Sequence, residues 1–459
     1  MRRAELSIVG ISPSSTRFNS RYHYGEHNAP LQQHSTRCQI TIMTSKERHE
    51  ARYQRRKAKR EAKKRAAIGK YDDYARATSV SALIGANWAS RKGVLWKGSV
   101  ARYNACYFKN ARYSHRQLAT GKDTRQGFYH FQIMERGKLR DVHSLHYAER
   151  VIRRSICTNA MVPILSHGLI YDNGASLKGK GINFAINRCA AMLHRYWRQY
   201  GDNEGYALVI DFRKYFDNIE HNPLFSVFDQ YIYDERLNRM CRSFVTATGE
   251  KGLFIGPEDS QISAIAYPSR IDHKIKDKWR CKFYERYMDD SVIIMRSKEE
   301  LFKLRDKLFA EYAKQGIVLN EKKTQIIKLS RGFTFLKTQF ILQPNGRVLQ
   351  KPCRAATIRE RRKLKSFRRF VSEGLLTVDQ VCNSFMSWRG YMGYKDAHRT
   401  IYNMDLLVYA LFAVKPWIKR KKQKHNKWKG VLSNEQPQLR KHGRNATGNR
   451  NPRLQECPF

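Results

Sequence analysis

The feature that most constrains the fold is a pair of adjacent aspartates near the middle of the chain. The stretch CKFYERYMDDSVIIM (281–295) places Asp289 and Asp290 between two largely apolar runs, as at the tip of a β-hairpin. Asp is a poor strand former, and neighbouring carboxylates repel each other. A further apolar run, YALVIDF (206–212), reads as a buried strand with Asp211 near its end. If the hairpin pairs beside this strand, three carboxylates meet at one sheet edge.

Such a cluster is costly unless cations neutralise it, because crowded carboxylates lose hydration and repel one another. Hard cations such as Mg²⁺ take oxygen ligands and keep positions open for phosphates. Two such ions about 4 Å apart can activate an attacking hydroxyl and stabilise a leaving oxygen in phosphoryl transfer. Asp in a turn is ordinary by itself. The combination predicts a platform for two Mg²⁺ ions, with Mn²⁺ as an alternative.

The charge of the chain favours a long polyanion as partner. The 459 residues contain 88 Lys and Arg against 40 Asp and Glu, a formal charge of +48. We therefore expect nucleic acid and no membrane partner, because no lipidation motif is visible and the longest apolar run, 406–414, is too short to span a bilayer. Nine scattered cysteines without a CxxC pair argue against a zinc ribbon or a disulfide scaffold and predict a reducing, cytoplasmic compartment.

The two ends of the chain read differently from its middle. Residues 1–42 lack a clear period, and Met43 looks like a natural start, so we expect 1–42 to be a non-native or disordered extension. Residues 43–70 form a strongly basic helical arm, from about 45 to 67, that is polar on all faces. We interpret this arm as nucleic-acid-binding, with a merely solvated helix as the alternative. Residues 431–459 are rich in Asn, Gln, Pro and Arg and predict a disordered tail.

Between these ends the pattern predicts mixed α and β structure. The stretch 135–156 reads as a turn that runs into a helix. An amphipathic helix with a Ser cap and a terminal Gly is expected at 297–316. Residues 333–342 predict a strand or hairpin. Two packed helices are expected at 357–374 and 377–394.

These motifs together resemble those of reverse transcriptases. VIDFRKYFDNI and RYMDDSVII resemble the two aspartate motifs of the palm, and GIVLNEKKTQI (316–326) resembles the motif that follows. FTFLKTQF resembles the primer-grip turn, and GKLRDVHSLHYAERVI (137–152) fits the fingers pattern without gaps. The resemblance covers about 130–400. It implies an α+β right-hand polymerase fold. Its parts would be fingers at 71–205, a palm of antiparallel sheet plus helices at 206–348, and a helical thumb with a basic tail at 349–430.

The resemblance also implies roles for single residues. Asp211 and Asp289 would be the main metal ligands, with the Phe212 carbonyl assisting, and Asp290 would complete the catalytic triad. Phe216 falls on the steric-gate position that excludes a 2′-hydroxyl, which favours dNTPs over NTPs.

Further residues would contact the substrates. Arg140 would clamp the triphosphate. Lys323 would lie near the leaving pyrophosphate as a proton donor, with a plain surface lysine as the alternative. The nucleotide-binding set is Lys138, Arg140, Lys214, Tyr215, Phe216, Ile255, Gly256, Gln261 and Lys323. The nucleic-acid-binding set is Arg150, Tyr287, Met288, Phe335 and Leu336, together with Lys178 and Lys180 of the basic Gly-rich loop 173–181.

The stretch LFIGPEDSQ (253–261) separates subfamilies. Many reverse transcriptases carry Gln-Gly-x-x-x-Ser-Pro here, whereas this chain has Ile255, Gly256, Ser260 and Gln261 in the pattern typical of diversity-generating retroelements. Those enzymes copy a template RNA with errors opposite adenines. An apolar Ile255 cannot hydrogen-bond where a Gln would, so we expect lower fidelity. The alternative is that Ile255 only fills space. The sequence offers no role for the two acids that follow Pro257.

The resulting hypothesis is an error-prone RNA-directed DNA polymerase that makes cDNA from a template-repeat RNA for mutagenic retrohoming. Its implied partners are template RNA, the cDNA/RNA hybrid, dNTPs and a small accessory protein that forms a complex with it. A bacterial phage-defence reverse transcriptase is the alternative. A degenerate polymerase that serves as an RNA scaffold is a third reading, against which the intact aspartates, Phe216 and Arg140 argue.

Overall fold

The computed structural model describes residues 44–135 and 137–416, so the predictions for 1–42, for the tail 431–459 and for most of the basic segment before it lie outside the described residues. The chain forms two units that divide between Lys63 and Lys64. Helix α1 (Ser45–Gly69) confirms the helix predicted for the basic arm. Nearly all of its side chains are exposed, as expected for a helix that is polar on every face.

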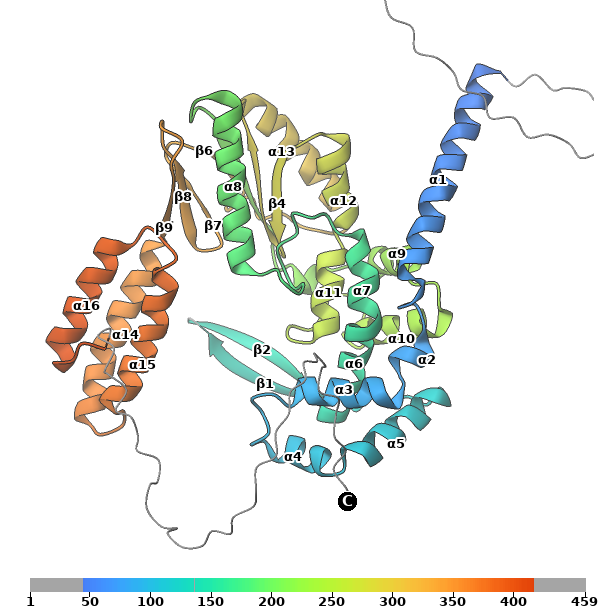
Figure 1. Ribbon diagram of the computed structural model, residues 1–459, viewed down its shortest axis with the longest axis horizontal. Coiled ribbons are helices and arrows are strands. Elements are labelled where there is room, and N and C mark those ends of the chain that lie inside the picture. Colours follow the sequence, from blue (N-terminus) through green and yellow to red (C-terminus); the bar gives the residue numbers. More distant parts are fainter. Residues whose placement is uncertain (1–43, 136, 417–459) are drawn as a thin grey trace, which may run out of the picture. The chain divides into compact units, whose positions relative to one another are not determined.

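The part that precedes the central sheet is helical except for one long hairpin. Its elements are α2 (Tyr74–Ala77), α3 (Val80–Ser90), α4 (Gly98–Ala105), α5 (Tyr107–Ala119), β1 (Phe128–Glu135), β2 (Lys138–Leu145), α6 (Tyr147–Ile156) and α7 (Val162–Leu165). The hairpin corrects the prediction that 135–156 turns directly into a helix. Residues 138–145 form β2 and pair with β1 along its whole length, and α6 begins only at Tyr147. Strands β1 and β2 therefore form a two-stranded ribbon where only a turn was predicted (Figure 1).

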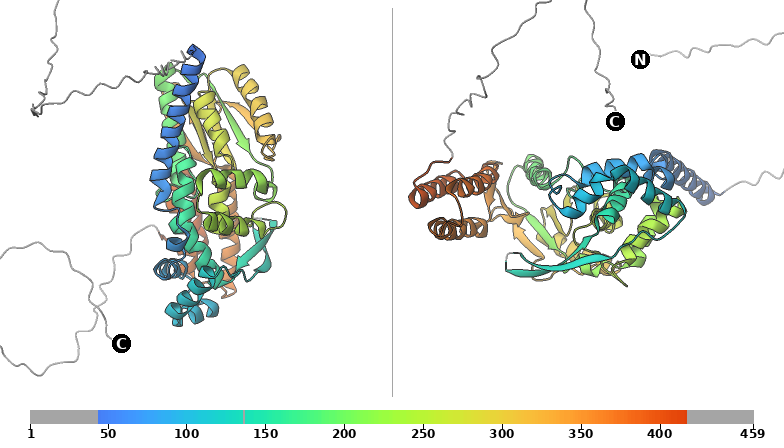
Figure 2. Two further views of the ribbon diagram at one scale, coloured as in Figure 1. Left: turned by 90° about the vertical axis from the view of Figure 1, so that its right-hand side faces the viewer. Right: turned by 90° about the horizontal axis from the view of Figure 1, so that it is seen from below.

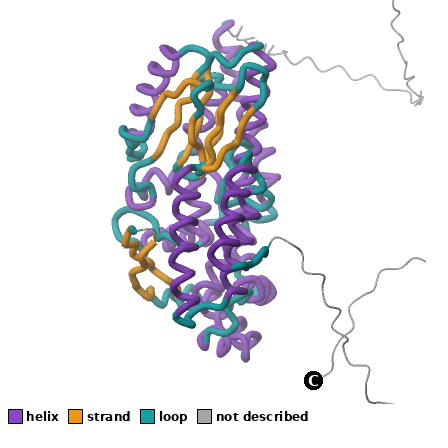
Figure 3. Tube along the Cα trace, turned by 90° about the vertical axis from the view of Figure 1, so that its left-hand side faces the viewer, coloured by secondary structure: helices purple, strands orange, loops and turns teal. Residues whose placement is uncertain are grey.

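The central sheet has four antiparallel strands in the order β4-β5-β3-β6. They are β3 (Tyr206–Asp211), β4 (Phe283–Tyr287), β5 (Asp290–Met295) and β6 (Gln325–Lys328). Helices α8 (Ile182–Tyr200) and α13 (Lys298–Ala313) cover opposite faces, with the strands between helices in Figure 3. Successive side chains of β3 point to opposite faces of the sheet and so join two different hydrophobic cores. Leu208 and Ile210 pack with the leucines of α13, whereas Ala207 packs with α8. The predicted helix at 297–316 is confirmed, with Ser297 as its N-cap.

Four helices lie between β3 and β4 along the chain. They are α9 (His221–Tyr231), α10 (Glu235–Thr246), α11 (Glu258–Ala266) and α12 (Ser269–His273). A second antiparallel sheet follows, with strands β7 (Phe333–Phe335), β8 (Thr338–Leu342) and β9 (Val348–Pro352) in sequence order. This sheet confirms the hairpin predicted at 333–342.

The last described part is a bundle of three helices, α14 (Arg354–Ser372), α15 (Val378–Met392) and α16 (His398–Phe412), which lie side by side in Figures 1 and 2. The first two confirm the predicted packed pair; the third was not predicted. A small core of Leu364, Phe385 and Val408 with their neighbours joins the three. Helices and antiparallel sheets together confirm the α+β class. None of the helices in the described part of the chain is long and apolar enough to cross a membrane.

Candidate active site

The register of the central sheet brings the predicted carboxylates together. Asp211 is the last residue of β3, Asp290 is the first of β5, and the two are directly opposed partners in the antiparallel ladder. Residues opposed in this way have Cβ atoms about 4.5–5.5 Å apart. Asp289 lies next to them in the two-residue turn between β4 and β5. The three aspartates thus meet at one edge of the sheet, as the sequence pattern predicted.

A buried ion pair supports the turn that carries Asp289. Met288 has a φ of +54°, which is unusual for a residue with a side chain. The Arg286 guanidinium donates a 3.1 Å hydrogen bond to the Met288 carbonyl and pairs at 2.6 Å with Asp272, both side chains being fully buried. Tyr284 donates its hydroxyl to the same aspartate at 2.6 Å. These supports were missed in the sequence, although the charged pair at 285–286 inside an apolar strand was a visible signal.

Asp211 is held by two side chains from the turn before β6. Lys323 Nζ lies 2.9 and 3.0 Å from the two carboxylate oxygens of Asp211, and Asn320 donates a side-chain hydrogen bond of 3.1 Å to Oδ2. The Asn320 backbone N–H also donates to the Asp211 carbonyl at 2.8 Å. The structure therefore places Lys323 in the site, while its predicted action as a proton donor stays a prediction. Asn320 was not predicted.

The electrostatics of the cluster show why it suits a cation. Burial raises the pKa of Asp290 to about 7, and the negative charges of Asp289 and Asp211 contribute to the rise. Burial also raises the pKa of Asp289. Among the residues the structure describes, no group of three or more His, Cys, Asp or Glu side chains is arranged to hold a metal ion. The Asp211 carboxylate instead forms an ion pair with the Lys323 ammonium. By donor chemistry, crowded carboxylates with raised pKa values still fit a divalent cation.

The residues after Asp211 turn sharply beneath the cluster. Phe212 forms an antiparallel bridge with Leu319, and its side chain is buried. Lys214 is exposed at a φ of +45°. Tyr215 is buried in the core, with its hydroxyl donating to the Ala264 carbonyl at 2.5 Å. Phe216 is half-buried and packs edge-on against the Tyr215 ring. Tyr215 is therefore placed to fix Phe216, whose ring keeps an open side.

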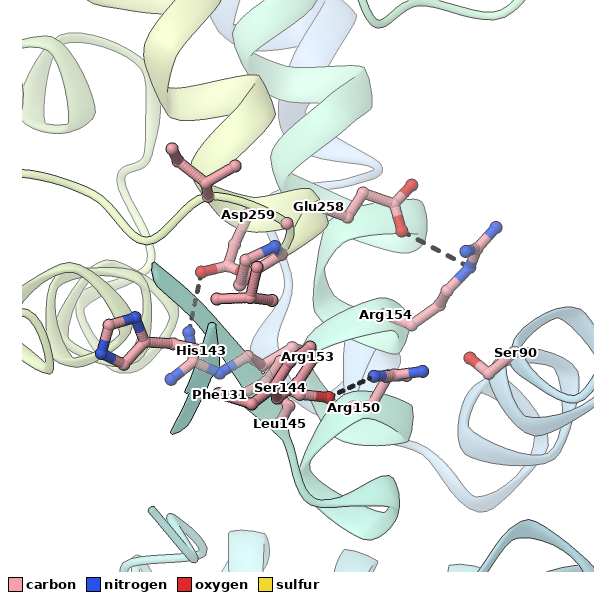
Figure 4. Close-up of a pocket in the computed structure, with 14 residues that line it drawn as sticks. Ser90, Phe131, His143, Ser144, Leu145, Arg150, Arg153, Arg154, Glu258 and Asp259 are labelled. Carbon is pink, nitrogen blue, oxygen red and sulfur yellow. Dashed lines mark hydrogen bonds and ion pairs between the residues drawn. The ribbon is translucent and has the colours of Figure 1, made fainter. Parts of the chain in front are cut away.

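The segment of Ile255 and Gly256 forms one wall of a cavity of about 360 Å³ (Figure 4). Ile255 is 43% exposed, and Gly256 has a φ of +124°, a conformation that favours glycine. The opposite wall comes from the hairpin β1–β2 and from α6. It includes Phe131, Val142, His143, Ser144, Arg150 and Arg154. Arg150 also donates a 3.2 Å hydrogen bond to Ser144, so this predicted nucleic-acid contact lies in the cavity with the two predicted nucleotide contacts.

Contacts on both sides fix the position of this segment. On one side the Phe254 ring packs against Phe128, with ring centroids 4.2 Å apart, and stacks on His143 at 4.4 Å. On the other side Arg153 pairs with Asp259 at 2.8 Å. Ile255 therefore lies between two anchors that both reach the part of the chain containing β1, β2 and α6.

The second of these anchors is a buried network of three charges. Arg153 pairs with Glu149 as well as with Asp259, at 2.8 Å in each case. Arg154 reaches Glu258 at 3.4 Å as a more exposed pair. The two acids to which the sequence gave no role thus join α11 to α6 (Figure 4).

The Gly-rich loop lies against the aspartate hairpin. Asn173 bridges to Arg286, and a side chain at Gly174 would come within 3.4 Å of the Tyr287 ring. Lys180 donates to the carbonyls of Tyr171 and Asn173 at 2.7 and 2.9 Å, so it closes the loop. Lys178 is exposed. Gln261 accepts a 3.2 Å hydrogen bond from Ser176 of the same loop, which connects the loop to α11.

The remaining predicted site residues have other surroundings. Phe335 is 2% exposed and belongs to the core between α8 and the second sheet, so its ring has no open face. Leu336 lies in the following turn at a φ of +48° and is partly buried against that core. In the ribbon, Lys138 pairs in register with Glu135, and Arg140 pairs with Ile133, which places both near the end of the hairpin.

Comparison with known proteins identifies part of this architecture. Residues 175–340 match the family model described as reverse transcriptase (RNA-dependent DNA polymerase). A curated relative, the retron Ec86 reverse transcriptase of Escherichia coli, is 31% identical over 125 residues, which cover 26% of this chain. The chain spans 38% of the length of that relative. The segment 175–340 that matches the family model contains Asp211, Asp289 and Asp290, and together with the sheet topology this match confirms the predicted right-hand polymerase fold.

Solved structures of lower similarity were also found. A telomerase of Candida tropicalis without its C-terminal domain aligns with a TM-score of 0.38 and 16% identity, over 49% of this chain and 55% of that one. A telomerase of Candida albicans in complex with a fragment of telomeric RNA aligns with a TM-score of 0.41 and 11% identity, over 66% and 61%.

Proposed function

We propose that the chain is an RNA-directed DNA polymerase, a nucleotidyltransferase that extends a primer with dNTPs on an RNA template. The observation that carries the proposal is the pairing of Asp211 with Asp290 beside the turn of Asp289, within the segment that matches the reverse transcriptase model. The charge of +48 suits the template RNA and the cDNA/RNA hybrid as partners.

Asp211, Asp289 and Asp290, with the Phe212 carbonyl, would hold Mg²⁺, with Mn²⁺ as an alternative. When bound, the metal supplies electrostatic stabilisation of the attacking and leaving oxygens. The Lys323 ammonium neutralises Asp211 when the carboxylate carries no cation, since its Nζ lies within 3.0 Å of both oxygens. Phe216, fixed by the buried Tyr215, would narrow the space beside the sugar and exclude a 2′-hydroxyl.

The test uses the purified full chain with Mg²⁺, an RNA template, an annealed primer and dNTPs. We expect cDNA from the wild type and none from Asp289→Ala/Asp290→Ala. Asp306→Ala is the control, because Asp306 is an exposed aspartate on α13 with only an exposed ion pair. Synthesis that persists in the double variant would overturn the assignment of the aspartates.

The finer proposal is a polymerase of the diversity-generating retroelement type that errs at template adenines during mutagenic retrohoming. The apolar Ile255 supports it, because its exposed side chain lines the cavity and offers no hydrogen bond to a nucleotide there. Sequencing of the cDNA should show errors concentrated opposite adenines, and Ile255→Gln should reduce them. Uniform low error would remove this subtype. The same proposal places the enzyme in the cytoplasm. It also includes a small accessory protein, whose complex with the enzyme would be detected as a hetero-oligomer.

The second candidate is a bacterial phage-defence reverse transcriptase. The observation that favours it is the 31% identity over 125 residues to a bacterial retron reverse transcriptase. The neighbouring DNA separates the two candidates. A nearby pair of repeats that differ mainly at adenines decides for the retroelement. DNA covalently attached to a tyrosine, or product formed without added template, decides for the defence enzyme.

A further inference from the structure

A basic groove lies on α8, away from the aspartate cluster. Its cavity volume is about 520 Å³, and its walls come from α8, between Arg188 and Arg198, and from the turn between β8 and β9. The lining side chains include Arg188, His194, Arg195, Trp197, Arg198 and Asn345, and no acid is among the lining residues. The groove therefore combines concentrated positive charge with one aromatic ring.

The two outer arginines of this groove are available to a ligand. Arg188 pairs with Asp172. Arg195 and Arg198 are exposed, and within the described residues neither has an ion pair or a side-chain hydrogen bond. They lie three residues apart on the helix and so project from one face. Two guanidinium groups on one face can each form a bidentate contact with a phosphate.

The aromatic side chain between them is held in one position. Trp197 donates its indole N–H to the Pro344 carbonyl at 3.0 Å. Gly346 has a φ of +81°, and a Cβ there would approach the indole ring to 2.6 Å, so only glycine lets the turn lie flat against it. The turn between β8 and β9 is thereby fixed to α8, and the groove keeps its shape without a ligand.

The groove is also remote from the reaction centre. The α8 residue Ala185 lies beside Gly174 of the loop that contacts Tyr287 in the aspartate hairpin. Arg195 follows ten residues later, which is about 15 Å along the helix. A strand bound at the aspartates would therefore need a separate segment, or a folded RNA, to reach the groove at the same time.

We propose that this groove binds the phosphate backbone of a folded part of the template RNA, outside the segment being copied. The choice of RNA rests on the proposed function. The groove itself requires only a polyanion, for which its charge and the unpaired Arg195 and Arg198 are complementary. It would retain a long template during synthesis, whereas a short template and primer would not use it.

The test compares Arg195→Glu/Arg198→Glu with Lys303→Glu/Lys307→Glu in the full chain. The control reverses two exposed charges on α13, so the change in net charge is the same. One probe is a folded transcript of about 200 nucleotides, and the other is a template and primer of about 20 nucleotides. Loss of two phosphate contacts should weaken binding of the transcript by about tenfold or more and lower the slope of log K against log salt by roughly 1.5. Extension of the short probe should change by less than twofold.

Each outcome decides. An equal loss of transcript binding in both variants, or no loss in either, overturns the proposal. If binding of polyglutamate depends on Arg195 and Arg198 while binding of the transcript does not, the proposal is overturned in favour of an acidic protein partner. If the wild type binds the transcript through the groove and extends no primer, the proposed function fails and the groove stands.

Discussion

Arg153 and Asp259 form an ion pair of 2.8 Å in which both side chains are less than 5% exposed. The pair joins α6 to the N-terminal turn of α11, four residues after Ile255. Arg153 also pairs with Glu149, and its guanidinium lies over the Phe244 ring at 4.5 Å. One buried cation thus serves two carboxylates, and the site carries an excess negative charge. Burial raises the pKa of Asp259, and the negative charge of Glu149 adds a smaller contribution in the same direction.

This excess predicts unequal costs for the two halves of the pair. Arg153→Met should lower the free energy of unfolding by about 3–5 kcal/mol, because two buried carboxylates lose their cation. Asp259→Asn should cost only about 1–2 kcal/mol, since Arg153 keeps Glu149 and the amide oxygen still accepts a hydrogen bond. Denaturant unfolding of both variants measures the difference. Equal costs would contradict the account of the charges.

Asp259→Asn should also change copying accuracy more than copying rate. Weakening this anchor lets the segment of Ile255 and Gly256 shift against the hairpin β1–β2, while the aspartates keep their own supports. We expect a severalfold change in the error frequency at template adenines, with kcat for correct dNTPs within about twofold. Sequencing of products and single-nucleotide kinetics provide the two measurements. The control is Glu258→Gln, which alters the neighbouring, more exposed pair with Arg154. An equal change of errors in both variants would contradict the anchor.

The part of this site that was predictable from sequence is the part set by local periodicity. Strands ending at Asp211 and beginning at Asp290 follow from continuous apolar runs, and one antiparallel pairing places the two side by side. The ribbon β1–β2 was not predicted although Tyr129, Phe131 and Ile133 alternate with the polar His130 and Gln132. These three apolar side chains are exposed, so the alternation does not mark a buried face that would place the strand in a core.

Side-chain pairs between distant segments were not predictable. Asp259 finds Arg153 across 106 residues, and Arg286 finds Asp272 only because α12 packs beneath the hairpin. Residue propensity and hydrophobic periodicity predict which face of a helix or strand is buried, but they do not predict which charged side chain from a distant segment pairs with a residue on that face. The residues with no role in the sequence pattern, Asp259 above all, were therefore explained only by the three-dimensional contacts.

Phe216→Ala should relax sugar selection. Removal of the ring opens the space that the steric gate would close, so the ratio of dNTP to NTP efficiency should fall by at least about tenfold. Single-nucleotide extension with each substrate measures the ratio as kcat/KM. Tyr215→Phe is the matched test of support, because it removes only the 2.5 Å hydrogen bond to the Ala264 carbonyl. It should lower the ratio less than Phe216→Ala does. An unchanged ratio in Phe216→Ala would exclude this residue as the gate.

Lys323→Met should strengthen binding of Mg²⁺ in the absence of nucleotide. The Lys323 ammonium competes with a cation for both oxygens of Asp211, but its side chain is 63% exposed, so the pair contributes at most about 1 kcal/mol. The Mg²⁺ concentration that gives half of the thermal shift should therefore fall by up to about fivefold. Lys322→Met, at an exposed neighbour, should leave that concentration unchanged. Weaker binding in Lys323→Met would show that the lysine supports the metal site instead.

Glu285→Gln should remove a pH-dependent loss of stability. Glu285 is fully buried on β4, and neither carboxylate oxygen has a hydrogen-bond partner in the described residues. Burial raises its pKa to about 9, and the charge of Asp172 adds to the rise, while Arg188, Lys276 and Lys180 oppose it. The folded state thus holds a proton that the unfolded state releases above about pH 4.3. Between that value and about pH 9, folding stability falls as the pH rises, by roughly 1 kcal/mol per pH unit.

Unfolding at pH 6 and pH 8 should show this slope to be steeper in the wild type than in Glu285→Gln by that amount. Glu321→Gln, at an exposed glutamate, should keep the wild-type slope. An identical slope in Glu285→Gln and the wild type would mean that Glu285 is ionised in the folded protein.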